Sequence, residues 1–344
     1  MLKKYPVNNL IVFLFFIVSQ FSWSQNDTIV LNNNDKLIGE IKAMDRGVVT
    51  VETDYSDSDF KITWIDIKSV KSTQIFLLTL SSGKRINSSL TTKDDNLGQV
   101  TITENGTELT IPISDIVYIK PVKDNFLSRI VASVSVGYNI TKSNNLSQFS
   151  VNSNLSYTAY KWLLTGSYNS VRSNQDDIEE TQRTDASIGF KYFMKRDWFY
   201  STEANFLSND EQKLKLRSTI KGGLGKYFIH SNKLFFGGGF GLAWNNEQYN
   251  DVTDANRNSL EAYGNLTLNM FDFSDFSLNT DLTFYPSLTE GGRYRADYNL
   301  NLKYDLPLDF FIKLGLTYNY DSKPVEGASV SDYVFQSTFG WEFN

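Results

Sequence analysis

Charged side chains of both signs recur at every second position in several segments of this 344-residue chain. The same spacing appears on both sides of residue 215 and again near residues 295 and 303. Because alternate residues of an extended strand lie on one face, these side chains predict a charged wall. Its expected members are Glu203, Lys213, Lys215, Arg217, Lys221, Glu261, Asp281, Arg295, Asp297, Lys303, Asp305 and Lys313.

Such a wall can do two kinds of chemistry. If it encloses water, its charges set the selectivity of a narrow pore, and the basic segment from Lys213 to Lys221 favours anionic solutes. If opposite charges meet across a narrow space, they pair and close it. The sequence leaves both alternatives open.

Candidates for catalysis are few. The chain has one histidine, His230, followed by Ser231 and Asn232. A hydrolase needs its histidine held beside a nucleophile or beside carboxylates. His230 falls in a short predicted turn in which Ser231 and Asn232 are turn formers, so we expect a solvated residue there and no enzymatic activity.

Other motifs carry no clear chemistry. The glycine run from Gly237 to Gly241 continues into a strand rather than a helix, which favours close strand packing over phosphate binding. Acidic residues between 176 and 180 and between 251 and 254 lack the spacing of a metal-binding loop. The absence of cysteine excludes disulfides and thiolate metal sites. We therefore expect no metal and no cofactor.

Long alternating strands are the elements that must position the charged wall. From Tyr294 to Leu306, apolar residues alternate one for one with Arg295, Asp297 and the polar residues that follow. Tyrosines stand at both ends of the apolar row, with leucines between them. This arrangement is typical of a strand with one face toward lipid.

The same alternation recurs about twelve times between residues 126 and 344, with residues 294–306 as the tenth strand. In these rows Leu163 and Val171 of the third strand and Leu214 of the sixth point outward with the apolar side chains. Tight turns at 159–161, 195–197, 230–232, 272–275 and 307–309 alternate with longer polar loops. An even number of strands with such loops predicts an all-β fold, a transmembrane antiparallel β-barrel of about 12 strands with both ends on the turn side.

Aromatic residues flank the tight turns, as at a membrane interface. They are Tyr160 and Trp162, Phe193 and Trp198, Phe228 and Phe235, Phe271 and Phe276, and Tyr304 and Phe310. A soluble β-sandwich would also bury one face of each strand, but it does not explain this clustering at one set of turns.

Residues 25–122 contain an internal repeat. Each half reads as about five short strands separated by Gly, Asn and Asp turns, and the halves share the endings Trp64-Ile65-Asp66-Ile67 and Ile113-Ser114-Asp115-Ile116. This pattern predicts a duplicated small β-barrel of the SH3-like or Sm-like kind, preceding the large barrel. Each shared ending is expected to form a single helical turn before a strand.

Residues 1–24 have the pattern of a secretory signal peptide. Lys3 and Lys4 precede an apolar run at 10–18, and Ser22 and Ser24 provide small residues for cleavage. The run is shorter than the ~20 residues of a membrane-spanning helix. The chain has 33 Lys and Arg against 39 Asp and Glu, and this acidic balance argues against a nucleic-acid partner.

The segments 37–41, Leu-Ile-Gly-Glu-Ile, 62–67, Ile-Thr-Trp-Ile-Asp-Ile, and 338–343, Thr-Phe-Gly-Trp-Glu-Phe, carry a family resemblance. In them the chain resembles the DUF481 family, bacterial proteins often described as salt-induced outer-membrane proteins. The resemblance spans nearly all of residues 25–344 and implies an outer-membrane barrel with a periplasmic amino-terminal domain. It supplies no catalytic motif. Asn344 follows Phe343, whereas outer-membrane barrels usually end on an aromatic residue.

Two functions fit these observations. The leading expectation is an integral outer-membrane protein that forms a narrow channel for small solutes, with residues 25–122 as a periplasmic accessory domain. The alternative is a non-conducting structural or docking protein, whose periplasmic module binds the cell wall or a protein partner. In either case the expected partners are outer-membrane lipid, lipopolysaccharide and the barrel-insertion machinery.

Overall fold

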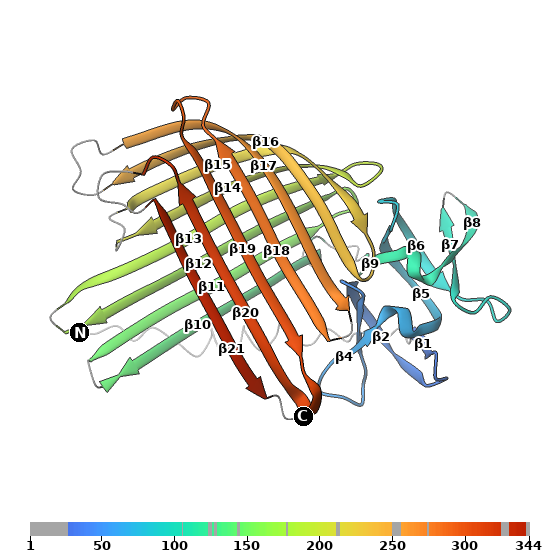
Figure 1. Cartoon of the computed structure of the whole chain (residues 1–344). Helices are drawn as coiled ribbons and strands as arrows, with labels where there is room; N and C mark the ends of the chain where they lie inside the picture. Colours follow the sequence, from blue (N-terminus) through green and yellow to red (C-terminus); the bar gives the residue numbers. More distant parts are fainter. Residues whose placement is uncertain are drawn as a thin grey trace, which may run out of the picture.

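The computed structural model describes residues 27–104, 106–122, 126, 129–142, 145–176, 178–210, 214–249, 256–273, 275–324 and 330–341. The described chain is all-β and forms one sheet of nine strands and one of twelve (Figure 1). These ranges contain no helix with the length and apolar character that a membrane span requires. The expected signal peptide, residues 1–24, lies outside them.

The nine-stranded sheet forms a small barrel, the N-terminal domain. Its strands are β1 (Asp27–Leu31), β2 (Lys36–Asp45), β3 (Val48–Glu52), β4 (Phe60–Thr63), β5 (Ile67–Leu80), β6 (Arg85–Thr91), β7 (Gln99–Glu104), β8 (Thr107–Pro112) and β9 (Ile116–Pro121). Strand β9 closes the barrel by pairing with both β2 and β5. Two single 3₁₀ turns, η1 (Trp64–Asp66) and η2 (Ile113–Asp115), stand before β5 and β9, as the shared sequence endings predict.

The two halves of the N-terminal domain share strand β5. Its first part pairs with β1 and its second part with β6 and β9, so β5 closes one half and opens the other. One hydrophobic core serves both halves, and the fully buried Trp64 of the first half donates its Nε1–H to the carbonyl oxygen of Ile113 in the second at 2.8 Å. The repeat therefore builds a single domain rather than two independent barrels.

The twelve-stranded sheet is antiparallel, and every pair of neighbours in it is also a pair of neighbours in sequence. Its strands are β10 (Ile130–Thr141), β11 (Leu146–Thr158), β12 (Trp162–Gln175), β13 (Ile178–Phe193), β14 (Trp198–Asn209), β15 (Leu214–His230), β16 (Leu234–Tyr249), β17 (Asn256–Phe273), β18 (Phe276–Pro286), β19 (Tyr294–Asp305), β20 (Phe310–Asp321) and β21 (Ser331–Trp341). The expected strand number and the place of residues 294–306 as the tenth strand are confirmed.

Registers along the large sheet sort its side chains into two faces. Leu224, Phe240 and Gly264 are successive partners across β15, β16 and β17, and the apolar residues of this face are exposed. Three expected outward residues are wrong. Leu163 and Val171 of β12 pair with Lys191 and Arg183 and lie on the opposite face. A bulge in β15 turns Leu214 inward, where it is fully buried. A bulge adds one residue to one strand, and alternation alone does not predict it.

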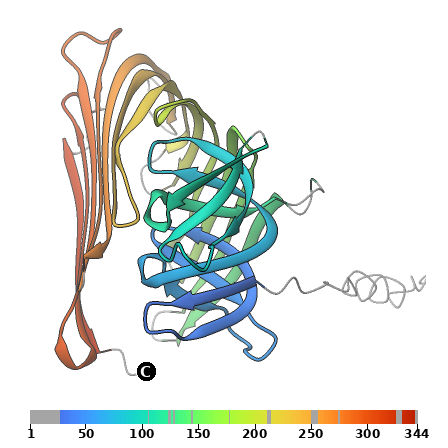
Figure 2. The same ribbon diagram turned by 90° about the vertical axis from the view of Figure 1, so that its right-hand side faces the viewer.

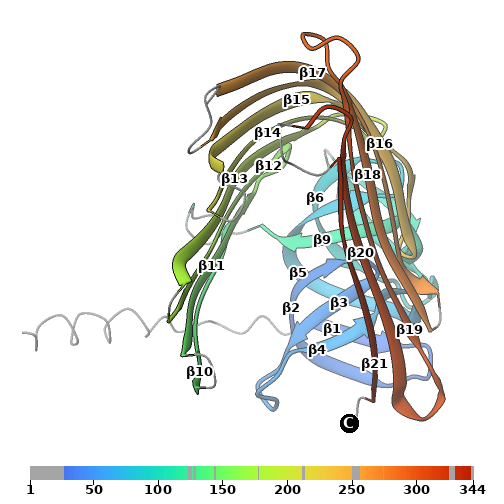
Figure 3. The same cartoon turned by 60° about the vertical axis from the view of Figure 1, so that its left-hand side comes forward.

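The large sheet arches over its inner face without closing. Figure 3 shows β10 and β21 at the two feet of the arch, and among the described residues no strand pairing joins them. The expected closed barrel is therefore present as a curved twelve-stranded sheet with two free edges. We call its inner surface the concave face.

The N-terminal domain packs on the tight-turn end of the large sheet (Figures 1 and 2). Asn232, in the turn between β15 and β16, is buried there, and its Nδ2 donates to the carbonyl oxygens of Ser114 and Ile116 at 2.8 and 2.9 Å. The hydroxyl of Tyr160, in the turn after β11, donates to the carbonyl oxygen of Arg85 at 2.5 Å. Both ends of the large sheet and the domain thus lie on the same side, as expected.

Candidate functional site on the concave face

The predicted charged wall is assembled on the concave face of the large sheet. Glu203 pairs in register with Lys221, Tyr285 with Arg295, Thr283 with Asp297 and Lys303 with Lys313. Arg217, Glu261, Asp281 and Asp305 fall on the same face. Lys215 is different, because it stands at the β15 bulge and is exposed. Lys213 lies outside the described residues.

Glu247 is the centre of the first buried cluster on this face. Its side chain is 1% exposed, and Arg217 donates from Nε to its Oε1 at 2.8 Å. Asn245 donates to the same oxygen and the hydroxyl of Tyr249 to the other, each at 3.1 Å. The carboxylate therefore has both a cation and neutral donors, which is what a buried charge requires. Arg217 was among the predicted wall residues, whereas Glu247 was not.

Glu261 is the centre of the second buried cluster. Its side chain is 0% exposed, and Arg295 binds it with two hydrogen bonds, Nε to Oε1 at 3.1 Å and Nη2 to Oε2 at 2.6 Å. Arg295 comes from β19 and Glu261 from β17, so the guanidinium crosses β18, where it lies 5.0 Å from the centre of the Tyr285 ring. A two-point arginine–carboxylate pair fixes both groups in orientation as well as in charge.

Other wall residues contact side chains on their own strand or on the next strand. Lys221 lies 3.3 Å from Glu203, and Lys303 lies 2.7 Å from Asp305. Asp281 accepts from Asn265 at 2.6 Å and from Thr267 at 3.0 Å. Lys313 is placed over the Phe311 ring, 4.3 Å from its centre. Of the two chemistries that the sequence left open, pairing along the wall is the one that these contacts display.

A third cluster joins the loops at the opposite end of the sheet from the N-terminal domain. Glu290 accepts from Arg257 at 2.9 and 2.6 Å and from Arg293 at 3.1 Å, while Arg293 also binds Asp321 at 3.0 and 2.6 Å. The Arg257 hydrogen bonds hold the pKa of Glu290 below its ordinary value. This loop clamp was not predicted, because its members come from three loops or strand ends with no shared spacing.

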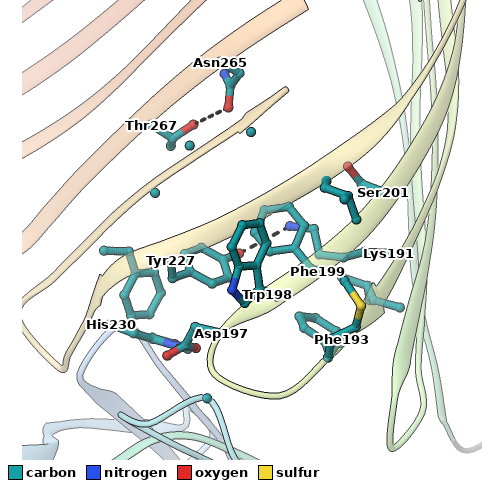
Figure 4. Close-up of a pocket in the computed structure, with 18 of the residues that line it drawn as sticks. Lys191, Phe193, Asp197, Trp198, Phe199, Ser201, Tyr227, His230, Asn265 and Thr267 are labelled. Carbon is teal, nitrogen blue, oxygen red and sulfur yellow. Dashed lines mark hydrogen bonds and ion pairs between the residues drawn. The ribbon is translucent and has the colours of Figure 1, made fainter. Parts of the chain in front are cut away.

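A chamber of about 630 Å³ lies where the N-terminal domain meets the concave face. Arg85 and Tyr118 line it from the domain, and Lys191, Phe199 and Tyr227 line it from the large sheet. Figure 4 shows the side chains from β13, β14 and β15 that gather on this part of the wall. Its volume lies within the ~300–1,000 Å³ of small-molecule sites.

His230 lies in this chamber, and its expected place as a solvated turn residue is wrong. It is the last residue of β15, its side chain is 10% exposed, and its Nδ1 lies 2.7 Å from Oδ1 of Asp197 (Figure 4). The ring also packs on Tyr227 and Phe235, at centroid distances of 5.0 and 4.7 Å. The docked domain covers the turns from which Asp197 and His230 come, and a single sequence without its partner surfaces does not reveal this burial.

The expected aromatic belt divides between the two faces. Tyr160, Phe228 and Tyr304 are exposed, as the belt requires, and Trp198 is exposed but also lines the chamber. Phe193 and Phe235 line the chamber, and Phe271 packs edge-on against Phe235 at 5.0 Å. Their assignment to a membrane interface is therefore wrong. These rings make the chamber partly apolar.

The fold and the site define the class: an all-β protein in which a small closed barrel is joined to a twelve-stranded antiparallel sheet, apolar outside and charged inside. This architecture is compatible with a membrane β-barrel. Residues 134–343 match the family described as protein of unknown function, DUF481, and the chain belongs to that family, as its sequence resemblance predicted. No curated protein matches the chain.

Proposed function

We propose that this protein is an outer-membrane channel for small solutes that is closed at rest, with its N-terminal domain covering the periplasmic mouth. The observation that carries the proposal is the chamber between the docked domain and the charged wall. A protein that only anchors a domain to the membrane needs no solute-sized space between that domain and the charged wall. A channel whose mouth is covered by a domain has such a space between the domain and the wall of its lumen.

A membrane location is supported by the exposed apolar face of the large sheet. Val134 is 73% exposed, Phe240 60% and Tyr333 67%, on strands that lie far apart around the arch. A soluble protein rarely leaves so broad an apolar surface in water, whereas lipid covers it without cost. The N-terminal domain lies on the tight-turn side, which is the periplasmic side in outer-membrane barrels.

A closed resting state is supported by the paired wall. Glu247 and Glu261 are buried beneath Arg217 and Arg295, so these carboxylates offer no solvated charge to a passing ion. At the other end, the loop clamp of Arg257, Glu290, Arg293 and Asp321 joins three loops across the rim. Opening therefore requires the domain to undock, the wall pairs to rearrange, or both.

Conductance of residues 25–344 in planar lipid bilayers tests the proposal. The informative variant is Asn232→Ala, which removes both hydrogen bonds to the N-terminal domain, and Asn33→Ala is the control because Asn33 is exposed and bonds only locally, to Asp35. We expect rare openings for the parent chain and the control, and a several-fold higher open probability for Asn232→Ala. A flat baseline for all three proteins would contradict the channel.

The docking alternative is favoured by one observation on the N-terminal domain. Within the described residues, β4 and β8 are the ends of the strand order, and β8 is largely exposed. A partner can add a strand to such an edge. If the bilayers stay silent, retention of one periplasmic protein by the parent chain, lost on Thr110→Pro in β8, would support this alternative.

We assign no catalytic role to the Asp197 and His230 pair. The hydroxyl of Ser231, the next residue, donates to the carbonyl oxygen of Leu234 at 3.1 Å rather than toward the histidine. The aromatic packing of the imidazole ring is better suited to holding two turns together beneath the domain. Lipid or peptide hydrolysis by residues 25–344 that disappears on His230→Ala would contradict this assignment.

A further inference from the structure

Arg85 has buried donors without a partner. It opens strand β6 at the wall of the chamber, and its guanidinium carbon lies 4.2 Å from the centre of the Phe193 ring. Its Nε and Nη1 are buried and have no hydrogen-bond partner. Buried polar groups in native proteins are almost always paired, so two unpaired guanidinium nitrogens at the wall of a cavity point to a bound group that accepts hydrogen bonds from them. Burial also lowers the pKa of Arg85.

Lys191 supplies a second cation from the opposite wall. It comes from β13, its Nζ donates to the hydroxyl of Tyr227 at 3.3 Å, and it lies 4.5 Å from the centre of the Phe199 ring (Figure 4). In the part of the chain that the structure describes, no carboxylate forms an ion pair with Arg85 or Lys191. An aromatic ring stabilises a cation only in part, and both cations keep donors for an anion.

The carboxylates of the chamber are mostly committed elsewhere. Asp197 lies beside His230, Glu203 beside Lys221, and Asp281 accepts from Asn265 and Thr267. Asp45, on the domain, is the remaining acidic residue of the lining. The lining sets four basic residues, Arg46, Arg85, Lys191 and Lys221, against these four acidic ones. Arg85 and Lys191 are the two cations that lie over aromatic rings of the chamber without a carboxylate among their described contacts.

We propose that the chamber binds a small organic anion, a carboxylate or a phosphate monoester, between Arg85 and Lys191. The oxyanion accepts hydrogen bonds from both cations, and an apolar body packs on Phe199 and Tyr227. A bare oxyanion would leave most of the 630 Å³ and the aromatic walls unused. The solute's route to the site rests on the proposed channel function, but its binding does not.

Calorimetric titration of residues 25–344 in a neutral detergent tests the ligand class. Benzoate is compared with benzamide, which has the same shape without the charge, and phenyl phosphate with inorganic phosphate. Because charge-assisted hydrogen bonds are about twice as strong as neutral ones, we expect the charged probe to bind at least about tenfold more tightly than benzamide. Equal affinities for benzoate and benzamide would contradict the proposal that the ligand is an anion. Equal affinities for phenyl phosphate and inorganic phosphate would contradict the proposal that the ligand has an apolar body.

Substitutions then locate the site. Arg85→Met and Lys191→Met remove one cation each with similar side-chain volume, and Lys226→Met is the control because Lys226 lies over Trp198 without lining the chamber. We expect each chamber variant to weaken benzoate at least about tenfold and the control to stay within about twofold. Lys191→Met leaves the contact of Arg85 with the sheet intact, so its loss of binding is not an effect of undocking. Unchanged affinity in both chamber variants would overturn the site.

Binding and conductance separate the two proposals. If the protein shows no conductance but binds benzoate through Arg85 and Lys191, the channel is contradicted and the binding site is supported. If the protein shows gated conductance but binds neither benzoate nor phenyl phosphate, the channel is supported and the binding site is contradicted.

Discussion

The pair of Arg295 and Glu261 shows what a buried charge demands of its neighbours. The carboxylate is fully buried and the guanidinium nearly so, and each is oriented by the other. Removing one member leaves the other charge buried without a counter-ion, which costs far more than the pair itself contributes. The pair is therefore a test of whether the concave face is as dry as its contacts indicate.

We expect Arg295→Met to lower the free energy of unfolding by ~3–5 kcal/mol, and the double variant Arg295→Met with Glu261→Gln to recover at least half of that. The partly exposed pair of Lys303 and Asp305 is the matched control, and Lys303→Met should cost no more than ~1 kcal/mol. Guanidinium unfolding of residues 25–344 in lipid vesicles, followed by tryptophan fluorescence, measures the free energy of unfolding of each variant. Similar costs for the two single variants would mean that water reaches Glu261.

Asp27, at the start of the N-terminal domain, gives a prediction about pH. Its side chain is buried, Oδ2 accepts from the backbone N–H of Ile41 at 2.8 Å, and burial raises its pKa above the ordinary 3.8. A raised pKa means that the contribution of Asp27 to stability is fully present below about pH 4 and is lost as pH rises through the folded-state pKa.

We therefore expect Asp27→Asn to remove this loss. Relative to Asp27→Asn, the parent domain should become less stable as pH increases from about 3 to about 7, because only the parent must bury a charge. Hydrogen exchange of peptides from residues 27–122, followed in the full chain with and without the substitution, measures the difference. A difference that stays constant over this pH range would show that Asp27 is not titrating in the folded domain.

At the scale of elements, docking of the N-terminal domain depends on tight turns that leave no room for a side chain. Gly83, with φ of 75° in the turn between β5 and β6, lies against the β13–β14 turn, and a Cβ there would come within 2.4 Å of the backbone nitrogen of Asp197. Gly98 has a similar φ of 80°, but a Cβ there would meet nothing within 4 Å. Substitution at Gly98 therefore tests backbone strain alone, whereas substitution at Gly83 adds a collision between the new Cβ and the backbone of Asp197.

We expect Gly98→Ala and Gly83→Ala to share a strain of ~1–2 kcal/mol from the left-handed backbone, and only Gly83→Ala to undock the domain. Hydrogen exchange in the turns at 194–197 and 231–233 should rise in Gly83→Ala and stay at the parent level in Gly98→Ala. Equal protection of these turns in the two variants would contradict the docking described above.

The strands were predictable from the sequence and their exceptions were not, for a physical reason. Alternation reports which face of a strand is apolar, so twelve strands, their turns and the face of Arg295 and Asp297 follow from residue spacing alone. The bulge that turns Leu214 inward and exposes Lys215 depends on pairing with β16. The burial of His230 and the two faces of the aromatic belt depend on a domain that lies more than a hundred residues earlier in the chain.

At the scale of the whole molecule, the free edges of β10 and β21 define how the sheet must close in a bilayer. An open edge is not tolerated in hydrocarbon, because its backbone groups have no partner there. When the strand registers are followed around the sheet, Thr158 at the turn end of β11 is level with Val330, beside the start of β21. Closure therefore needs a stagger of at least about the eleven residues of β21.

We expect a stagger of about fourteen residues, because twelve strands ~4.8 Å apart then tilt by ~39°, in the middle of the ~35–45° range of membrane barrels. That register sets Val134 opposite Phe339. Since the chain has no cysteine, Val134→Cys with Phe339→Cys should form a disulfide in membranes, and Val134→Cys with Ser337→Cys should not. The reverse result would mean a stagger of about twelve, and no disulfide in either would contradict closure between these strands.

The strand order of the large sheet also predicts the order in which its strand pairs form. Every neighbour in that sheet is the next strand along the chain, so eleven contacts form by local hairpin closure, and the seam between β10 and β21 is the one junction that must join distant segments. Local contacts form fast and distant ones slowly. We therefore expect the seam to be the last step of assembly. In the proposed membrane location, we expect the N-terminal domain, complete by Pro121, to fold before the strands that follow it insert. In a time course of insertion, the disulfide of Val134→Cys with Phe339→Cys should appear after heat-resistant compaction is under way, and its appearance first would reverse this order.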